Sequence, residues 1–412
     1  MKTVGIIAEY NPFHTGHEYQ ITYTKEKLGA DFVVVAMSGD FVQRGTPALF
    51  SKYTRAKMAL LCGADLVLEL PVSVSTASAE LFAKGGVQLL DSLGVIDELC
   101  FGSECGDAQA LMELAEIFTE EPVEFKSALR QNLKNGLAFP KARSMAIAAV
   151  LPDSHKFQQL LSSPNNILGI EYCKAILREH SAITPVAIKR EGNAYHENTL
   201  SENSFPSASA IRNALFNPHT DRDSLLKLSR QFLPPSCQEL FLQTIQEGLF
   251  LGESDFDLLY RYCLLQETEE SLCTYLDMSP SLTRRVLACK NQYETFSQFT
   301  LLLKTKEITH TRIQRALLHI LLHIQDTPAT IPYARVLGFR KSSSSLLNKI
   351  KKQGTIPLLT KLSDAQKILE QNSDFLKILR ETTFASNLYE TTIAQKKNTA
   401  CIHEYRQQII IL

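Results

Sequence analysis

Short apolar runs alternate with helical stretches over the first hundred residues, and this order restricts the fold more than any other feature of the chain. The runs cover residues 4–8, 32–36, 65–70 and 98–101, and each has the length of a buried parallel strand. A helical stretch at residues 17–28 follows the first run, and Ser51 is placed to cap the next helix. This order predicts an α/β fold with a doubly wound parallel sheet, whose ligands lie beyond the carboxyl ends of the strands.

The alternation of predicted strands and helices ends at about residue 217. Before that point, residues 185–190 form the last predicted strand, residues 192–206 a polar loop, and Ser207 a hydroxyl cap for a further helix. Beyond it, residues 311–324 and 346–352 keep apolar residues at helical spacing. We therefore expect an all-helical C-terminal domain with one irregular stretch around residues 331–338.

The chain has no feature of a membrane or secreted protein. No apolar run approaches the ~18 residues of a membrane span, and Glu9 comes too early for a signal peptide. The nine cysteines form an odd set without a CxxC pair, which excludes a disulfide framework and a zinc ribbon. We expect a soluble, cytoplasmic protein with core thiols, no metal site and no membrane partner.

Positive charge is concentrated in the last part of the chain, although the net charge is only −1. Residues 301–412 contain 17 Lys and Arg against 8 Asp and Glu. A basic region of this kind indicates a polyanion such as nucleic acid, with a plain solvated surface as the alternative.

The segment from Glu9 to His17 is the strongest chemical motif. His14 and His17 lie three residues apart at a predicted helix start, and Gly16 lets a ligand approach the backbone. A helix N-terminus favours a phosphate, and two imidazoles could bind the oxygens that gain charge as pyrophosphate leaves. The alternatives are ordinary capping or core histidines, or a metal pair that lacks a third ligand nearby.

The same segment resembles the HxGH signature of the nucleotidylyltransferase superfamily. Residues 207–212 are similar to its serine/threonine-x-x-Ile-Arg motif, which supplies hydroxyls and a guanidinium to the triphosphate. Longer strings resemble the bacterial tRNA(Met) cytidine acetate ligases, and the resemblance runs from residue 2 to beyond 360. These strings are residues 9–17, 37–45, 101–104, 164–169 and 334–339.

This resemblance implies a fold, an activity and partners. The sheet would be of the nucleotidylyltransferase (HUP-like Rossmann) type, with an ATP-binding catalytic domain at 1–216 and a mainly helical, basic, tRNA-binding domain at 217–412. Members of the family join acetate and ATP into acetyl-adenylate, releasing pyrophosphate, and then acetylate N4 of the wobble cytidine, position 34, of elongator tRNA(Met). We therefore expect ATP with Mg²⁺, acetate and this tRNA as ligands, and no DNA. Nothing in the sequence predicts the oligomeric state.

Two other functions fit the same motifs. One is a cofactor adenylyltransferase of the phosphopantetheine or nicotinamide mononucleotide type, although such enzymes need only the first domain. The other is a tRNA-binding protein without catalysis, which the intact His14, Gly16, His17 and Arg212 argue against.

The resemblance also implies site residues. His14 and His17 would stabilise charge on the triphosphate, while Ser209 and Arg212 grip its β and γ groups. Gly102 could equally be a turn glycine, one of the two asparagines could cap a helix, and Arg190 could be a surface charge. The predicted ATP-binding residues are Ile7, Ala8, Glu9, Tyr10, Asn11, Pro12, Phe13, His14, Thr15, Gly16, His17, Glu18, Tyr19, Gln20, Gly102, Asn165 or Asn166, and Arg190.

Three further roles complete the predictions. Residues 38–45 are the candidate cover of the site, with a β–α connection that does not move as the alternative, and Asp40 is the nearest carboxylate to test. Basic side chains of the C-terminal region are expected to contact tRNA phosphates. They are Arg335, Arg340, Lys341, Lys349, Lys351 and Lys352.

Overall fold

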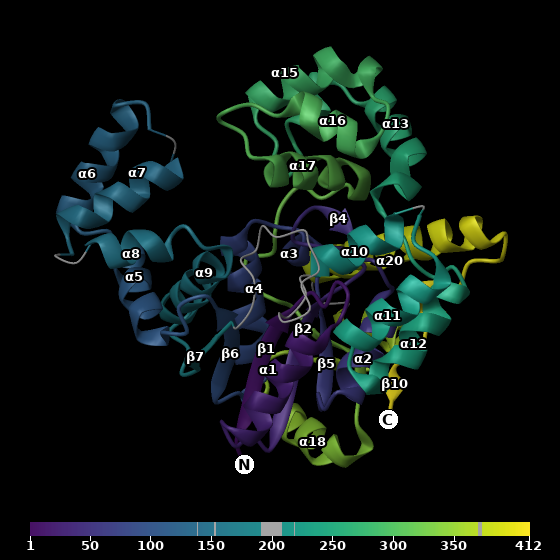
Figure 1. The fold of residues 1–412 in the computed structure, drawn as a ribbon. Coiled ribbons are helices and arrows are strands. Elements are labelled where there is room, and N and C mark those ends of the chain that lie inside the picture. The colour runs from purple at the N-terminus through teal and green to yellow at the C-terminus, as the bar shows by residue number, and fades with distance from the viewer. Residues whose placement is uncertain (138, 152–153, 191–207, 218, 370–372) are drawn as a thin grey trace.

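The protein is built around one main sheet, seen in Figure 1, in a computed structural model that describes residues 1–137, 139–151, 154–190, 208–217, 219–369 and 373–412. Within these residues, the sheet has the strand order β10-β8-β5-β2-β1-β6-β7, with β9 paired to β8, and β3 and β4 form a separate hairpin. The strands are β1 (Thr3–Ala8), β2 (Phe32–Ser38), β3 (Phe41–Val42), β4 (Thr46–Pro47), β5 (Leu66–Leu70), β6 (Glu98–Ser103), β7 (Thr184–Lys189), β8 (Ala334–Phe339), β9 (Leu358–Leu359) and β10 (Ile410–Ile411).

The direction of the chain through the sheet marks one place for a ligand. From β1 the chain moves through β2 to β5 on one side, and it then returns to β6 and β7 on the other side of β1. All these neighbours pair in parallel. Open sheets bind ligands where the strand order reverses, beyond the carboxyl ends of the strands. The loop that follows β1 lies at this position.

Helices cover both faces of the sheet. Alternate residues of β2 face opposite layers, because successive side chains of a strand point to opposite sides. Val34 and Ala36 join a core with α4, α5 and α9, while Val33 and Val35 join a core with α1, α2 and α12. The helices are α1 (Thr15–Glu26), α2 (Lys52–Leu61), α3 (Val72–Ser75), α4 (Ala79–Asp91), α5 (Ala108–Glu120), α6 (Val123–Lys134), α7 (Phe139–Ala146), α8 (Ser154–Leu160), α9 (Pro164–Arg178), α10 (Ala208–Phe216), α11 (Arg222–Phe232), α12 (Pro235–Gln246), α13 (Asp257–Gln266), α14 (Glu269–Leu272), α15 (Pro280–Cys289), α16 (Phe296–Leu303), α17 (His310–Leu322), α18 (Ser344–Gln353), α19 (Leu362–Leu369) and α20 (Ser373–Lys397).

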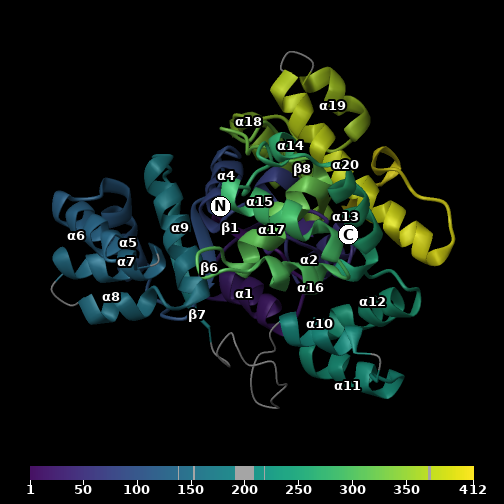
Figure 2. The same cartoon turned by 90° about the horizontal axis from the view of Figure 1, so that it is seen from above.

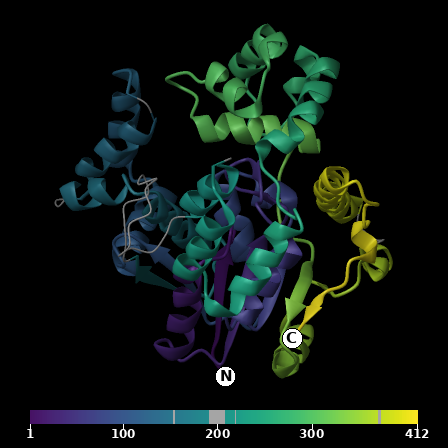
Figure 3. The same cartoon turned by 45° about the vertical axis from the view of Figure 1, so that its right-hand side comes forward.

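Two helical units extend beyond the sheet. Figures 1 and 3 show α13, α15, α16 and α17 above the upper ends of the central strands, where the carboxyl end of β1 lies. A third core fills this unit and includes Phe41 and Val72 from the first part of the chain. Seen from above in Figure 2, α5 to α8 project on one side of the sheet, and α10 to α12 lie toward the opposite side.

The predicted α/β fold with a doubly wound parallel arrangement is confirmed, and each of the five predicted strands is present. The N-cap at Ser51 is also confirmed, because its side chain accepts a hydrogen bond from the N–H of Thr54. The predicted loop at 192–206 and the cap at Ser207 lie outside the described residues.

The expectation of an all-helical C-terminal domain is wrong. The stretch expected to be irregular contains strand β8, which pairs antiparallel with β5, and β10 extends the sheet further. This strand was missed because the charged Arg335 lies among its apolar residues, so the segment does not read as a continuous apolar run. The boundary at 216/217 stays a prediction, and the sheet takes strands from both sides of it.

In the part of the chain that the structure describes, no helix combines the length and apolar character needed to cross a bilayer.

Candidate active site

The two histidines of the loop between β1 and α1 accept hydrogen bonds from backbone N–H groups of the same segment. His14 is the N-cap of α1, where its Nδ1 accepts a hydrogen bond from the Gly16 N–H at 3.1 Å. In return, the His14 N–H donates to Nδ1 of His17 at 3.2 Å. The two rings stack with their centroids 3.7 Å apart. The two histidines therefore cap the helix, which was one of the alternatives from the sequence. Each ring uses only its Nδ1 in these contacts.

These contacts determine where each imidazole carries its proton. Since both Nδ1 atoms accept, a neutral ring must hold its hydrogen on Nε2. Burial, with the charges of Arg190 and Arg212, lowers the pKa of His14 from 6.5 to about 3. Burial, followed by His14 and Arg190, holds the pKa of His17 well below its ordinary value. The pair is neutral near pH 7 and offers two Nε2–H donors.

Arg212 joins the second predicted motif to this loop. From α10, its Nη1 donates to the carbonyl oxygen of Asn11 at 2.5 Å, and its Nη2 donates to Oγ of Ser209 at 3.1 Å. Asn11 is itself held, because its Oδ1 accepts from the N–H of Leu49 at 2.7 Å. The structure thus brings together two motifs that lie about two hundred residues apart in the sequence.

The other predicted residues of the segment 7–20 divide between core and surface. Ile7 and Ala8 end β1, and the side chains of Tyr10 and Phe13 are buried in the core. Tyr19 is 41% exposed on α1, whereas Gln20 donates from Nε2 to the carbonyl oxygen of Cys100 at 2.9 Å. The side chains of Tyr10 and Phe13 therefore support the loop from the side of the core.

Residues 38–45 are packed against the protein, which argues against a moving cover. Phe41 and Val42 are buried in the β3–β4 hairpin. A Cβ on Gly45, whose φ is +79°, would lie 2.4 Å from the backbone nitrogen of Arg315 in α17. Glu9 also fixes the segment, because its Oε1 accepts from the N–H of Gln43 at 2.8 Å.

Gly102 lies in β6 beside Arg190, which directly follows β7. A Cβ at Gly102 would lie 3.3 Å from Cγ of Arg190, and the Arg190 N–H donates to the carbonyl oxygen of Ser103 at 2.9 Å. The glycine therefore makes room for the arginine stem. This places Arg190 close enough to the histidine pair for its charge to lower their pKa values.

Neither Asn165 nor Asn166 caps α9, so that reading of the sequence is wrong. The carboxylate of Glu104 accepts from the Asn165 N–H at 3.3 Å, from Asn165 Nδ2 at 2.8 Å and from the Asn166 N–H at 2.8 Å. Asn166 is buried and accepts from the N–H of Cys105. Asn165 is the less buried of the two.

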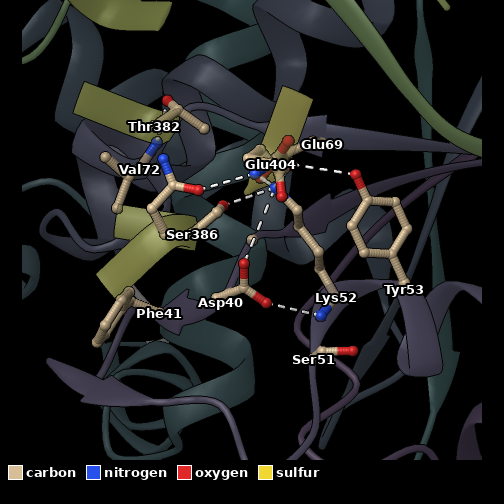
Figure 4. Close-up of polar contacts among 12 residues, drawn as sticks. Asp40, Phe41, Ser51, Lys52, Tyr53, Glu69, Val72, Thr382, Ser386 and Glu404 are labelled. Atoms are coloured by element: carbon tan, nitrogen blue, oxygen red, sulfur yellow. Dashed lines mark hydrogen bonds and ion pairs between the residues drawn. The ribbon is translucent and has the colours of Figure 1, made fainter. Parts of the chain in front are cut away.

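Arg335 and Asp40 belong to a buried ion cluster, which we define as Asp40, Lys52, Glu69, Arg335 and Glu404. Lys52 Nζ lies 2.7 Å from Glu69, 2.6 Å from Glu404 and 3.8 Å from Asp40 (Figure 4). Arg335 lies 2.7 Å from Glu404 and 3.3 Å from Glu69. The predicted contact of Arg335 with tRNA phosphate is therefore wrong, because its side chain is only 5% exposed.

The other predicted tRNA contacts lie near α18, at the amino ends of the parallel strands. Arg340 N–H donates to the carbonyl oxygen of Asp65, directly before β5, and Figure 1 shows α18 at the same end as the N-terminus. Lys341, Lys349, Lys351 and Lys352 thus lie at the opposite edge from the histidine pair. Their contact with tRNA stays a prediction.

Arg55 and Glu104 are two important residues for which the sequence pattern indicated no role. Most of their partners are backbone N–H or carbonyl groups of distant segments, which leave no local spacing pattern. Glu104 was part of a motif string, and Arg55 stands one turn into α2. Among the described residues, no group of three or more His, Cys, Asp and Glu side chains could hold a metal ion.

Comparison with known proteins gives consistent findings. A family model described as HIGH nucleotidyl transferase matches residues 1–404. The tRNA(Met) cytidine acetate ligase of Acetivibrio thermocellus is 38% identical and covers 100% of both chains. A protein of the same name from Clostridium perfringens is 39% identical, over 89% of this chain and 91% of its own. Crystal structures of Thermotoga maritima TmcAL, without ligand and bound with alpha-thio ATP, superpose with TM-scores of 0.92 and 0.90, at 31% identity and full coverage of both chains.

Proposed function

Because this chain belongs to the HIGH nucleotidyl transferase family, together with the tRNA(Met) cytidine acetate ligases that it matches over most or all of their length, we propose that it is an ATP-dependent ligase of that kind. The observation that carries the proposal is the neutral pair of His14 and His17, with Arg212 bound to the same loop at the carboxyl end of β1. The alpha-thio ATP in the related Thermotoga maritima structure supports ATP as the nucleotide.

In the first step, an oxygen of acetate attacks the α-phosphorus of ATP. The bond between this phosphorus and the bridging oxygen breaks, which gives acetyl-adenylate and pyrophosphate. The Nε2–H groups of His14 and His17 donate to oxygens of the leaving pyrophosphate, where negative charge develops. Ser209 and Arg212 hold the β and γ groups from the other side, and the permanent charge of the guanidinium suits it to this role.

The remaining predicted residues shape the nucleotide site. Gly102 and Arg190 border the site on the β6 side, and Asn165 is the better placed of the two asparagines to meet the nucleotide, because Asn166 is buried. Mg²⁺ is expected to arrive with ATP, held mainly by phosphate oxygens and water, and to neutralise phosphate charge. This fits a loop whose own donors are imidazole and guanidinium groups.

In the second step, the exocyclic N4 amine of cytidine 34 in elongator tRNA(Met) attacks the acetyl carbonyl, and AMP leaves. Amino groups of cytosine are poor nucleophiles, so a mixed anhydride is the activation that this chemistry needs. The cytidine must leave its stack to reach the acetyl group. No DNA partner is proposed.

Exchange of labelled pyrophosphate into ATP tests this function against its rivals. The full chain is assayed with acetate, with phosphopantetheine or nicotinamide mononucleotide, and without an added acid. Exchange that requires acetate is the expected result. Exchange with a cofactor precursor instead would identify an adenylyltransferase, and no exchange under any condition would favour a tRNA-binding protein without catalysis.

Replacing the histidines tests their part in the reaction. His14→Ala and His17→Ala should each lower the rate of exchange by about 100-fold, the usual cost of removing one donor to developing charge, with tRNA affinity kept. His219→Ala is the matched control, because this histidine is exposed. Wild-type exchange in both loop variants would disprove the assigned role.

A further inference from the structure

We propose that Arg55 is a positioning residue of the ATP site, which holds the loops after β1 and β2 through their backbone carbonyls. The inference rests on the proposed function, because the ATP site and the exchange reaction are both part of that proposal. Arg55 lies on α2, and its side chain is fully buried. It contacts no atom that we assign to substrate, so it acts through the loop alone.

Its guanidinium binds four carbonyl oxygens from three segments. Nε donates to Phe50 at 2.9 Å, Nη1 donates to Glu9 at 2.6 Å and to Ser38 at 3.0 Å, and Nη2 donates to Gly39. Glu9 follows β1 and Ser38 ends β2, so one side chain joins the carboxyl ends of two central strands. These ends flank the position where the strand order reverses.

The chemistry of guanidinium explains why arginine occupies this position. Its five N–H groups lie in one plane and diverge in fixed directions, whereas an ammonium group has three donors and no fork. Burial lowers the pKa of Arg55, and the hydrogen bonds to four carbonyl dipoles offset part of the cost of burying the charge. A lysine could satisfy only some of these carbonyls.

The contact at Glu9 determines the path of the next residues. Its carbonyl belongs to the peptide that precedes Tyr10, whose φ of +50° lies in the left-handed region that aromatic residues rarely adopt. Holding this carbonyl favours that backbone conformation over the extended alternatives. The chain then leads through Asn11 to the N-cap His14, so the orientation of the Glu9 carbonyl affects where both imidazoles stand.

The helix that carries Arg55 is itself anchored. Lys52 begins α2, its N–H donates to Oδ1 of Asp40 at 2.7 Å, and its Nζ lies in the buried ion cluster (Figure 4). Arg55 follows on the next turn. The start of α2 is therefore held in place next to Arg55. A residue that positions other groups needs such support.

The test replaces Arg55 by lysine in the full chain and measures the Kd of a non-hydrolysable ATP analogue, together with kcat and KM for exchange. We expect Arg55→Lys to bind the analogue at least about tenfold more weakly and to lose about 100-fold in kcat, with tRNA affinity unchanged. Arg285→Lys is the matched control, because Arg285 also donates to two backbone carbonyls, those of Leu302 and Leu303, but within the helical unit.

Each result has a defined meaning. Analogue affinity and kcat equal to wild type in a folded Arg55→Lys variant would overturn the proposal, as would equal losses in Arg285→Lys. If the wild type shows no acetate-dependent exchange, the proposed function fails, and the analogue Kd still tests Arg55. If Arg55→Lys does not fold, hydrogen exchange of the wild type replaces it. Residues 9–10 and 39–40 should then gain protection together on binding the analogue, and protection of one segment alone would contradict the proposal.

Discussion

At the scale of residues, the histidine pair obtains its chemistry from the backbone around it. The spacing of His14 and His17 predicts a phosphate site at a helix start, and the capping contacts add that both rings donate from Nε2. A sequence pattern cannot specify this tautomer, because it depends on which nitrogen faces which N–H. The sequence also did not predict the roles of Arg55 and Glu104, because they bind mainly backbone atoms of segments that are distant in the sequence.

The tautomer can be tested by NMR with nitrogen-labelled histidine. His14 and His17 should remain neutral, with protonated Nε2, at pH values well below 6.5, because burial lowers the pKa of His14 to about 3. The contribution of His14 to the free energy of unfolding is therefore highest above pH 6.5. It falls as the pH is lowered toward 3, since the unfolded chain binds a proton at this histidine before the folded chain does.

The signals are assigned with His14→Ala and His17→Ala. An imidazolium pattern for either ring at about pH 6, near the ordinary histidine pKa, would contradict the neutral pair. His219, which is exposed, serves as the internal reference for an accessible histidine.

At the scale of elements, the sequence predicts the strands that form continuous apolar runs, and it misses a strand whose burial depends on residues distant in the sequence. The parallel strands β1, β2, β5 and β6 are buried on both faces, so their continuous apolar runs are visible. Strand β8 is also buried, but its Arg335 is neutralised by Glu69 and Glu404, and such compensation is invisible in a linear pattern.

Helix α9 offers a test at this scale. Glu104→Gln should lower the free energy of unfolding by about 1–2 kcal/mol, because an amide has one acceptor oxygen where the carboxylate receives three hydrogen bonds at a helix N-terminus. Urea unfolding measures the change.

Glu179→Gln is the control for Glu104→Gln, because Glu179 is the C-cap of the same helix, where a negative charge is unfavourable. Its unfolding free energy should stay at or slightly above that of the wild type. Equal destabilisation by the two substitutions would contradict the capping role of Glu104.

At the scale of the whole molecule, the two halves of the chain share one sheet and one ion cluster. Strands β8 and β10 come from the second half, and Glu404, near the C-terminus, neutralises Lys52 of the first half. The sequence suggested separate domains because its rhythm changes near residue 217. It could not reveal that the later segments return to the sheet, since strand pairing depends on the packed fold.

Glu404→Gln tests this connection. The substitution leaves Lys52 and Arg335 with less negative charge in a buried place, so we expect a loss of about 3–5 kcal/mol in unfolding free energy. Glu307→Gln on an exposed segment is the control, with no measurable change expected. A Glu404→Gln variant as stable as the control would show that the ion cluster does not hold the halves together.

The proposed reaction requires that acetate attack the α-phosphorus of an ATP molecule held by the loop of His14 and His17. Acetate labelled with oxygen-18 tests it most directly, in a reaction with unlabelled ATP and elongator tRNA(Met), followed by mass spectrometry of AMP and pyrophosphate. We expect one labelled oxygen in AMP, none in pyrophosphate, and a loss of labelling with His14→Ala or His17→Ala. Acetylated tRNA with unlabelled AMP, or label in pyrophosphate, would contradict it.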